Sequence, residues 1–175
     1  MPEDAKKRIE AAYNQLENLV KEVPGYKGYK DKEICREADK LIRLKVAAGL
    51  QEQRRRLNSI EVRLATEGRL GALLVLDRSL MRLQLLIDRL KTASYGYSGL
   101  FDAKKVTEAE LEALYQYDAA MLEKAGELRQ LIDAVSATPG DESLTKAGST
   151  LLEALEEMND YFSRRQDAIL QIGTL

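Results

Sequence analysis

Two glycine-rich segments of this sequence combine tyrosine, lysine and glycine in a way that suits binding. The stretch "VPGYKGYKDKE" at residues 23–33 repeats Gly-Tyr-Lys twice, and a looser version, "SYGYSGLFDAKK", follows at residues 94–105. Glycine lets the backbone approach a ligand closely, lysine and helix N-terminal N–H groups attract anions, and tyrosine offers stacking area with a polar tip. These residue types could hold an acidic peptide, a phosphate or a nucleotide.

The candidate binding residues come from both segments and from the start of the helix that follows the first. They are Tyr26, Lys27, Tyr29, Lys30, Arg36, Tyr95, Tyr97, Phe101, Lys104 and Lys105. The alternative interpretation is structural, with the aromatic rings closing the open end of a helical bundle and the lysines solvating it. The glycine spacings match neither the phosphate loop of nucleotide hydrolases nor the dinucleotide fingerprint, so they specify no nucleotide.

Catalytic and metal chemistry find little support in the sequence. The chain has no histidine, which removes the commonest general base and the commonest transition-metal ligand. Its one cysteine, Cys35, excludes an internal disulfide framework and has no second thiol for redox chemistry. Carboxylate-bridged di-metal sites in helical bundles need Glu-x-x-His pairs, which this chain lacks. We therefore expect no cofactor, no metal and, on balance, no enzymatic activity.

The composition is that of long helices. The 175 residues are rich in Leu, Ala, Glu, Lys, Arg and Gln, and no alternating run of β-branched and aromatic residues predicts a strand. This length suits one domain, residues 1–175, with a sizeable core. No apolar run approaches the roughly 20 residues that span a bilayer, and the N-terminus lacks an apolar signal core. We therefore expect no membrane span and a cytoplasmic location.

Apolar residues at alternating separations of three and four predict five amphipathic helices. Their expected ranges are about 3–22, 32–67, 70–93, 108–136 and 142–171. The boundary between the second and third depends on Gly68 and Gly71, because two such glycines cost roughly 1 kcal/mol each in a helix interior. The alternative is one unbroken helix of about 60 residues, near 90 Å long, which exceeds what a compact domain of this length covers.

We therefore predict an all-α, elongated, antiparallel five-helix bundle. Helices joined by short turns pack as antiparallel neighbours, so the loops at 23–31 and 94–106 should share one end of the bundle. The helix at 70–93 carries a regular apolar stripe, which Leu70, Leu74, Met81, Leu85 and Leu86 widen. A helix with apolar residues over most of its circumference is expected to sit centrally and contact several neighbours.

Asp118 occupies a position in the apolar seam of the helix at 108–136. A buried acid is costly unless it is paired, so we expect a structural buried polar residue that bonds an arginine, a tyrosine or a backbone donor. Arg78, Arg82 and Arg89 are the candidate partners. The alternative is an acid whose titration is tuned for chemistry.

Charge is divided unevenly along the chain. Residues 1–106 carry 22 Lys/Arg and 15 Asp/Glu, a net +7, whereas residues 107–175 carry 5 and 14, a net −9. One interpretation is that basic and acidic helices attract each other within one bundle, and the other is a bipolar surface that recruits a charged partner. The overall charge of −2 disfavours nucleic acid. Arg54–Arg56 do not make a patch, because consecutive helical residues point about 100° apart.

The expected function is that of a non-enzymatic interaction or scaffold protein. Its protein partner would dock at the tyrosine-, glycine- and lysine-rich end formed by loops 23–31 and 94–106, or along the basic face of the helix at 32–67. The alternative is a bundle that binds a small anionic ligand or nucleotide at the same end. The sequence leaves a homo-oligomer open.

Overall fold

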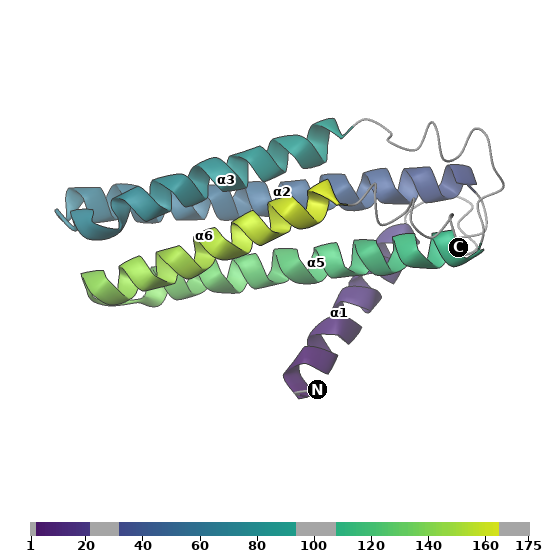
Figure 1. Cartoon of the computed structure of the whole chain (residues 1–175), viewed down its shortest axis with the longest axis horizontal. Coiled ribbons are helices and arrows are strands. Elements are labelled where there is room, and N and C mark those ends of the chain that lie inside the picture. Colours follow the sequence, from purple (N-terminus) through teal and green to yellow (C-terminus); the bar gives the residue numbers. More distant parts are fainter. Residues whose placement is uncertain (1–2, 22–31, 94–107, 165–175) are drawn as a thin grey trace.

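The computed structural model describes residues 3–21, 32–93 and 108–164, and its regular elements in these ranges are all helices. The α-helices are α1 (Glu3–Val20), α2 (Lys32–Thr66), α3 (Leu73–Thr92), α5 (Glu108–Ala137) and α6 (Asp141–Ser163), and a short 3-10 helix, η1 (Leu70–Ala72), precedes α3. Figure 1 shows them as an elongated bundle. The predicted all-α bundle is confirmed.

The break after α2 is a Schellman motif built around Gly68. The Arg69 N–H donates to the Leu64 carbonyl at 2.9 Å, and the Gly68 N–H donates to the Ala65 carbonyl at 3.2 Å. Gly68 has a φ of +73°, in the left-handed region that glycine adopts without steric cost. Position 68 therefore ends α2, and the predicted break between the second and third helices is confirmed.

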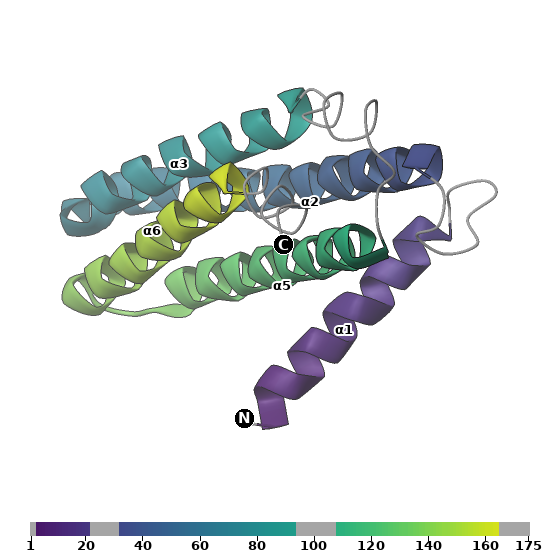
Figure 2. The same cartoon turned by 45° about the vertical axis from the view of Figure 1, so that its right-hand side comes forward.

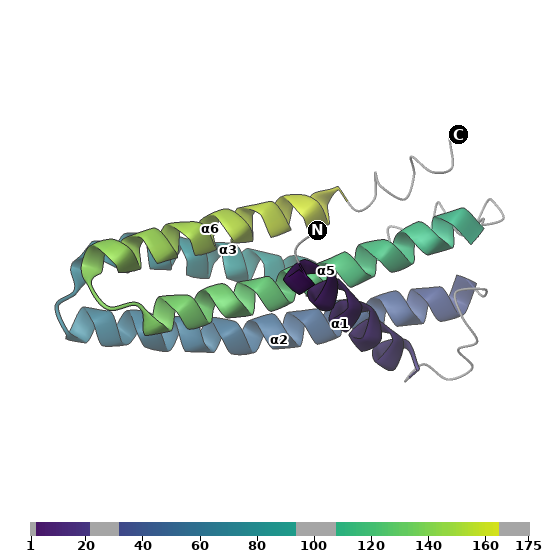
Figure 3. The ribbon, with the colours of Figure 1, turned by 90° about the horizontal axis from the view of Figure 1, so that it is seen from below.

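The helices form two antiparallel hairpins. Within the first, the Arg43 side chain of α2 bonds the backbone at Leu90 and Ala93, at the far end of α3. Within the second, Tyr117 of α5 stacks on Tyr161 of α6. The turns of both hairpins lie at the same end of the bundle, on the left in Figure 1 and in Figure 3.

The two hairpins lie side by side so that the neighbours across their boundary run parallel. Proceeding along α3 and α6 together, Val75 lies against Gly148, Arg82 against Glu156, and Arg89 against Ser163. In the same way α2 packs along α5. The partners within each hairpin are antiparallel neighbours, whereas α3 and α5, which follow each other in the sequence, are diagonal in the bundle.

Leucine and isoleucine side chains from all five α-helices fill one continuous core. α2 and α5 are longer than α3 and α6, and α1 packs beside them, burying Leu16, Leu19 and Val20. Figure 2 shows the N-terminal half of α1 diverging from the bundle. The outcome is a four-helix bundle with a fifth helix set obliquely against α2 and α5.

Candidate functional site

Most of the binding end predicted from the sequence lies outside the described residues. This holds for Tyr26, Lys27, Tyr29, Lys30, Tyr95, Tyr97, Phe101, Lys104 and Lys105. Arg36 belongs to α2, but its side chain is not among those described. The helices that follow the two loops, α2 and α5, both begin at the end of the bundle opposite the hairpin turns (Figure 1). The clustering of the predicted site therefore stays a prediction.

Asp118 is completely buried in α5. Two of the three arginines expected to pair with it contact α6 instead. Arg82 forms an ion pair with Glu156 at 3.4 Å, and Arg89 bonds the last turn of α6. The expected burial of Asp118 is confirmed, whereas its pairing with Arg82 or Arg89 was wrong, because α3 and α5 are diagonal in the bundle and the flank of α3 reaches its neighbour α6.

Arg89 closes the C-terminal end of α6. Its Nη1 donates to the Asn159 carbonyl at 2.9 Å, its Nη2 donates to Ser163 Oγ at 2.7 Å, and its guanidinium lies 5.3 Å from the Phe162 ring centroid. Asn159 is itself buried and donates from Nδ2 to the carbonyls of Arg82 and Leu155. Arg89 and Asn159 thus tie the backbones of α3 and α6 together, so their role is structural.

Arg43 of α2 bonds the C-terminal end of α3. It is buried to 4% exposure, and its Nη1 donates to the carbonyls of Leu90 and Ala93 at 3.0 Å each. A cation beside helix C-terminal carbonyls is stabilised by the helix dipole. Sequence reasoning missed this residue, although a signal exists: Arg43 stands three and four residues before Val46 and Ala47, on the apolar face of α2.

Tyr117 and Tyr161 pair α5 with α6. Their rings are nearly parallel, at 7° and 4.4 Å between centroids. The Tyr117 hydroxyl donates to the Tyr161 carbonyl at 2.8 Å, and the Tyr161 hydroxyl reaches the Tyr117 carbonyl at 3.4 Å. Two of the chain's tyrosines thus lock one hairpin, and they were not singled out from the sequence.

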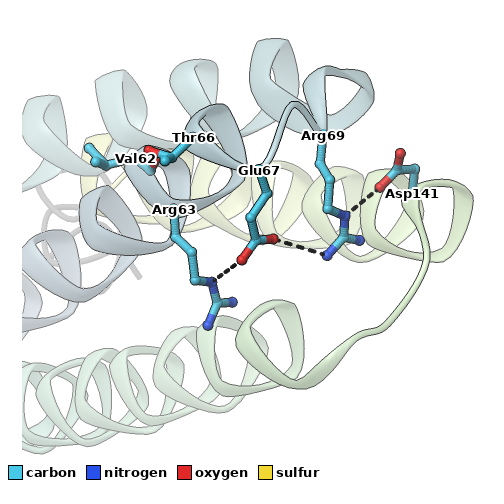
Figure 4. Close-up of polar contacts among 6 residues, drawn as sticks. All are labelled: Val62, Arg63, Thr66, Glu67, Arg69 and Asp141. Atoms are coloured by element: carbon cyan, nitrogen blue, oxygen red, sulfur yellow. Dashed lines mark hydrogen bonds and ion pairs between the residues drawn. The ribbon is translucent and has the colours of Figure 1, made fainter.

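The turns of both hairpins are joined by charged side chains, which Figure 4 shows in a row from α2 to α6. Arg69 Nε donates to Asp141 Oδ1 at 2.7 Å, while Glu67 lies 3.9 Å from Arg69 and 4.0 Å from Arg63. All of these groups are at least partly exposed. They connect the two turns.

Two adjoining cavities lie where α1 meets α5. One, of about 210 Å³, also reaches α2 and is lined by Gln15, Lys45, Gln53, Leu122, Gly126 and Arg129 among others. The second, of about 170 Å³, shares Gln15, Leu122 and Gly126. Ligand pockets usually measure about 300–1,000 Å³, so each of these is small for a nucleotide.

The most distinctive surface among the described residues is a row of exposed apolar side chains on η1 and α3. Leu70, Leu74 and Met81 are each 65% exposed, and Leu85 is 43% exposed. Because helical residues four or seven positions apart lie on the same face, these four side chains share one face. We call these four residues the outer stripe. The central position expected for this helix was wrong, because among the described α-helices α2 and α6 are its main neighbours and the outer stripe is exposed.

The described part of the chain gives little support for a metal site or a basic patch. No cluster of His, Cys, Asp or Glu suited to a metal ion occurs in it. Arg55 pairs with Glu52 on its own helix, whereas Arg56 pairs with Asp133 of α5, so Arg54–Arg56 do not act as one patch. None of the described helices combines the length and apolarity needed to cross a membrane.

Comparison with known proteins adds no functional assignment. No family model matches the sequence, and no curated protein or solved structure matches it either.

Proposed function

We propose that this protein is a non-enzymatic interaction protein and that its partner docks on the outer stripe of α3. The observation that carries the proposal is the exposure of Leu70 on η1 and of Leu74, Met81 and Leu85 on α3. Exposed apolar residues scattered singly are normal on protein surfaces, whereas contiguous ones mark interaction sites.

The stripe has the dimensions of a helix-docking surface. Residues 70 and 85 are 15 apart, which corresponds to about 22 Å along a helix. Fully burying a leucine or methionine side chain contributes about 1.5–3 kcal/mol, so covering four that are 43% to 65% exposed favours association by several kcal/mol before its entropic cost. An amphipathic helix whose apolar residues recur at three, four and seven positions is the partner that fits.

The buried polar side chains have structural roles, as expected of a scaffold protein. Arg43, Arg89 and Asn159 bond backbone carbonyls of neighbouring helices and hold these helices together. A rigid bundle built in this way can present a helix face without rearranging, which lowers the entropic cost of docking.

The tyrosine- and lysine-rich end remains our proposal for a second docking surface. It rests on the sequence of loops 23–31 and 94–106, whose residue types suit an acidic partner. Lys27→Glu combined with Lys30→Glu should abolish such binding without lowering the melting temperature. If the loops are a structural plug, these changes should leave binding as it is, whereas Tyr29→Ala should lower the melting temperature.

The alternative of a small anionic ligand finds less support. The described cavities lie beside α1 rather than at the end predicted from the sequence, and both are small. The cytoplasmic location expected from the sequence stays a prediction.

The experiment that tests the proposal replaces Leu74 and Met81 with glutamine in the full chain. Leu44→Gln is the matched control, because Leu44 is also exposed but lies on α2, outside the outer stripe. The double variant should keep the urea midpoint of the wild type and lose the proteins, including further copies of this chain, that co-purify with it from the native host. Retention of every such protein by the double variant would overturn the proposal.

A further inference from the structure

Two opposite charges border the outer stripe. Asp77 and Arg78 stand three and four residues after Leu74 and precede Met81 by four and three. With about 100° between successive residues, they lie on opposite sides of the line from Leu74 to Met81. The stripe therefore has one acidic and one basic edge at its middle.

Contacts with neighbouring helices identify which edge is which. Burial and, after it, the nearby Asp77 carboxylate raise the pKa of Glu61 in α2, so Asp77 lies on the edge next to α2. Arg82 pairs with Glu156 in α6, and Arg78 lies one turn before Arg82 on the same flank. The basic edge is therefore the one next to α6.

Both edge charges are available to a partner. Neither Asp77 nor Arg78 forms an ion pair within the described structure, and both are exposed. Asp77 has a like charge, Glu61 of α2, as its neighbour. A cation placed against this edge would relieve the repulsion between the two carboxylates.

We infer that the helix docked on the outer stripe is α3 of a second copy of this chain, aligned parallel to the first about a two-fold axis. The inference deepens the proposed function and rests on it. In this arrangement Leu74 meets Leu74 of the second copy and Met81 meets Met81. Each Asp77 faces Arg78 of the second copy, so that both charge pairs form at once.

The parallel orientation of the two α3 helices follows from the charges on the two edges of the outer stripe. A two-fold axis parallel to α3 brings the α2 edge of one copy against the α6 edge of the other, which pairs acid with base. An axis perpendicular to α3, which makes the helices antiparallel, brings like edges together and sets Asp77 against Asp77 and Arg78 against Arg78. Like charges placed opposite each other suppress the second arrangement.

The flanking helices favour the same orientation. α2 carries nine basic and five acidic residues, a net +4, whereas α6 carries one basic and six acidic residues, a net −5. Parallel pairing sets α2 of each copy beside α6 of the other. Antiparallel pairing would set α2 beside α2 and α6 beside α6, so the helix charges and the edge residues agree.

Charge-swapped variants test the inference by sedimentation equilibrium. The wild type should be dimeric at about 100 µM, and Asp77→Arg or Arg78→Asp alone should raise the dissociation constant at least about tenfold. An equimolar mixture of the two variants should recover the dimer, because each copy then supplies what the other lacks. Leu44→Gln should sediment as the wild type. A monomeric wild type at this concentration, or swaps without effect, would overturn the inference.

Cysteine pairing distinguishes the two orientations. In a Cys35→Ser background, the Met81→Cys thiols of two chains should form a disulfide with each other under oxidation if the helices are parallel. Antiparallel helices would instead link Leu74→Cys to Met81→Cys in a mixture, which would contradict the parallel arrangement. If the wild type is monomeric and the Leu74 and Met81 glutamine variant still loses a different protein, this inference fails while the proposed function stands.

Discussion

Arg69 and Asp141 are 72 residues apart in the sequence, and their side chains meet at 2.7 Å between the turns of the two hairpins. Arg56 with Asp133 and Arg82 with Glu156 repeat the relationship further along the bundle. In each pair the base comes from the α2–α3 hairpin and the acid from the α5–α6 hairpin. The uneven charge of the sequence thus serves, in part, to hold the two hairpins together.

This relationship predicts a measurable stability difference. Arg69→Gln should lower the free energy of unfolding by about 0.5–1 kcal/mol, since the Arg69 side chain is only 28% exposed and bonds across the hairpins. The control is Lys146→Gln, an exposed lysine on α6, which should change it by less than about 0.5 kcal/mol. Urea unfolding measures both. Equal effects of the two substitutions would contradict the structural role of Arg69.

A larger loss is expected at Arg43. Arg43→Met should lower the free energy of unfolding by about 2–3 kcal/mol, because it leaves the carbonyls at the end of α3 without their buried donor. Hydrogen exchange should accelerate in the last turn of α3 more than elsewhere. Lys91→Met, which removes an exposed bond to Gln51 between the same two helices, should have little effect.

Alanine substitutions of Gly49 and Gly148 should change the stability of the protein in opposite directions. A Cβ at position 148 would lie 2.7 Å from Val75 Cγ1, whereas nothing lies within 4 Å of one at position 49. Gly49→Ala should therefore stabilise the protein by about 0.5–1 kcal/mol through helix propensity, and Gly148→Ala should destabilise it by about 1–3 kcal/mol.

The double variant Gly148→Ala with Val75→Ala checks the cause. It should lose less stability than the two single effects added together, because the shorter side chain at position 75 makes room for the new Cβ. Additive losses in thermal unfolding would show that the close approach of α3 and α6 is not responsible.

Glu61 should give the protein a pH-dependent stability. Burial and then Asp77 raise the pKa of Glu61, so its ionised form is less favourable in the folded than in the unfolded chain. The penalty is present at neutral pH and disappears as pH falls through the folded pKa. Glu61→Gln should therefore be more stable than the wild type at pH 7, and the gain should vanish in acid. A gain that stays constant across this range would contradict the assignment.

Local sequence patterns predicted the helices well, and they did so for physical reasons. Periodicity locates an apolar face, and the glycine at position 68 allows the left-handed conformation that ends α2. The same periodicity does not say which helix covers a face. The leucines at 70 and 74 count as core on that pattern, yet they are exposed because α3 has neighbours on two sides only.

The site was less predictable than the fold. Arg82 and Arg89 were expected to reach Asp118, but choosing their partners requires knowing that α3 is beside α6 and diagonal to α5. No spacing in a single sequence encodes the order of helices around a bundle. The tyrosine-rich end was found by residue type, and whether its two loops meet depends on residues that the structure does not describe.

A photo-reactive amino acid at position 81, introduced in the native host, would capture a partner that docks on the outer stripe of α3. A second chain with the same group at Ala134, an exposed position on α5, is the control. We expect an adduct of discrete mass from position 81, at twice the chain mass if the partner is a second copy, and none from position 134. No adduct from position 81, or the same adducts from both positions, would contradict docking on the outer stripe.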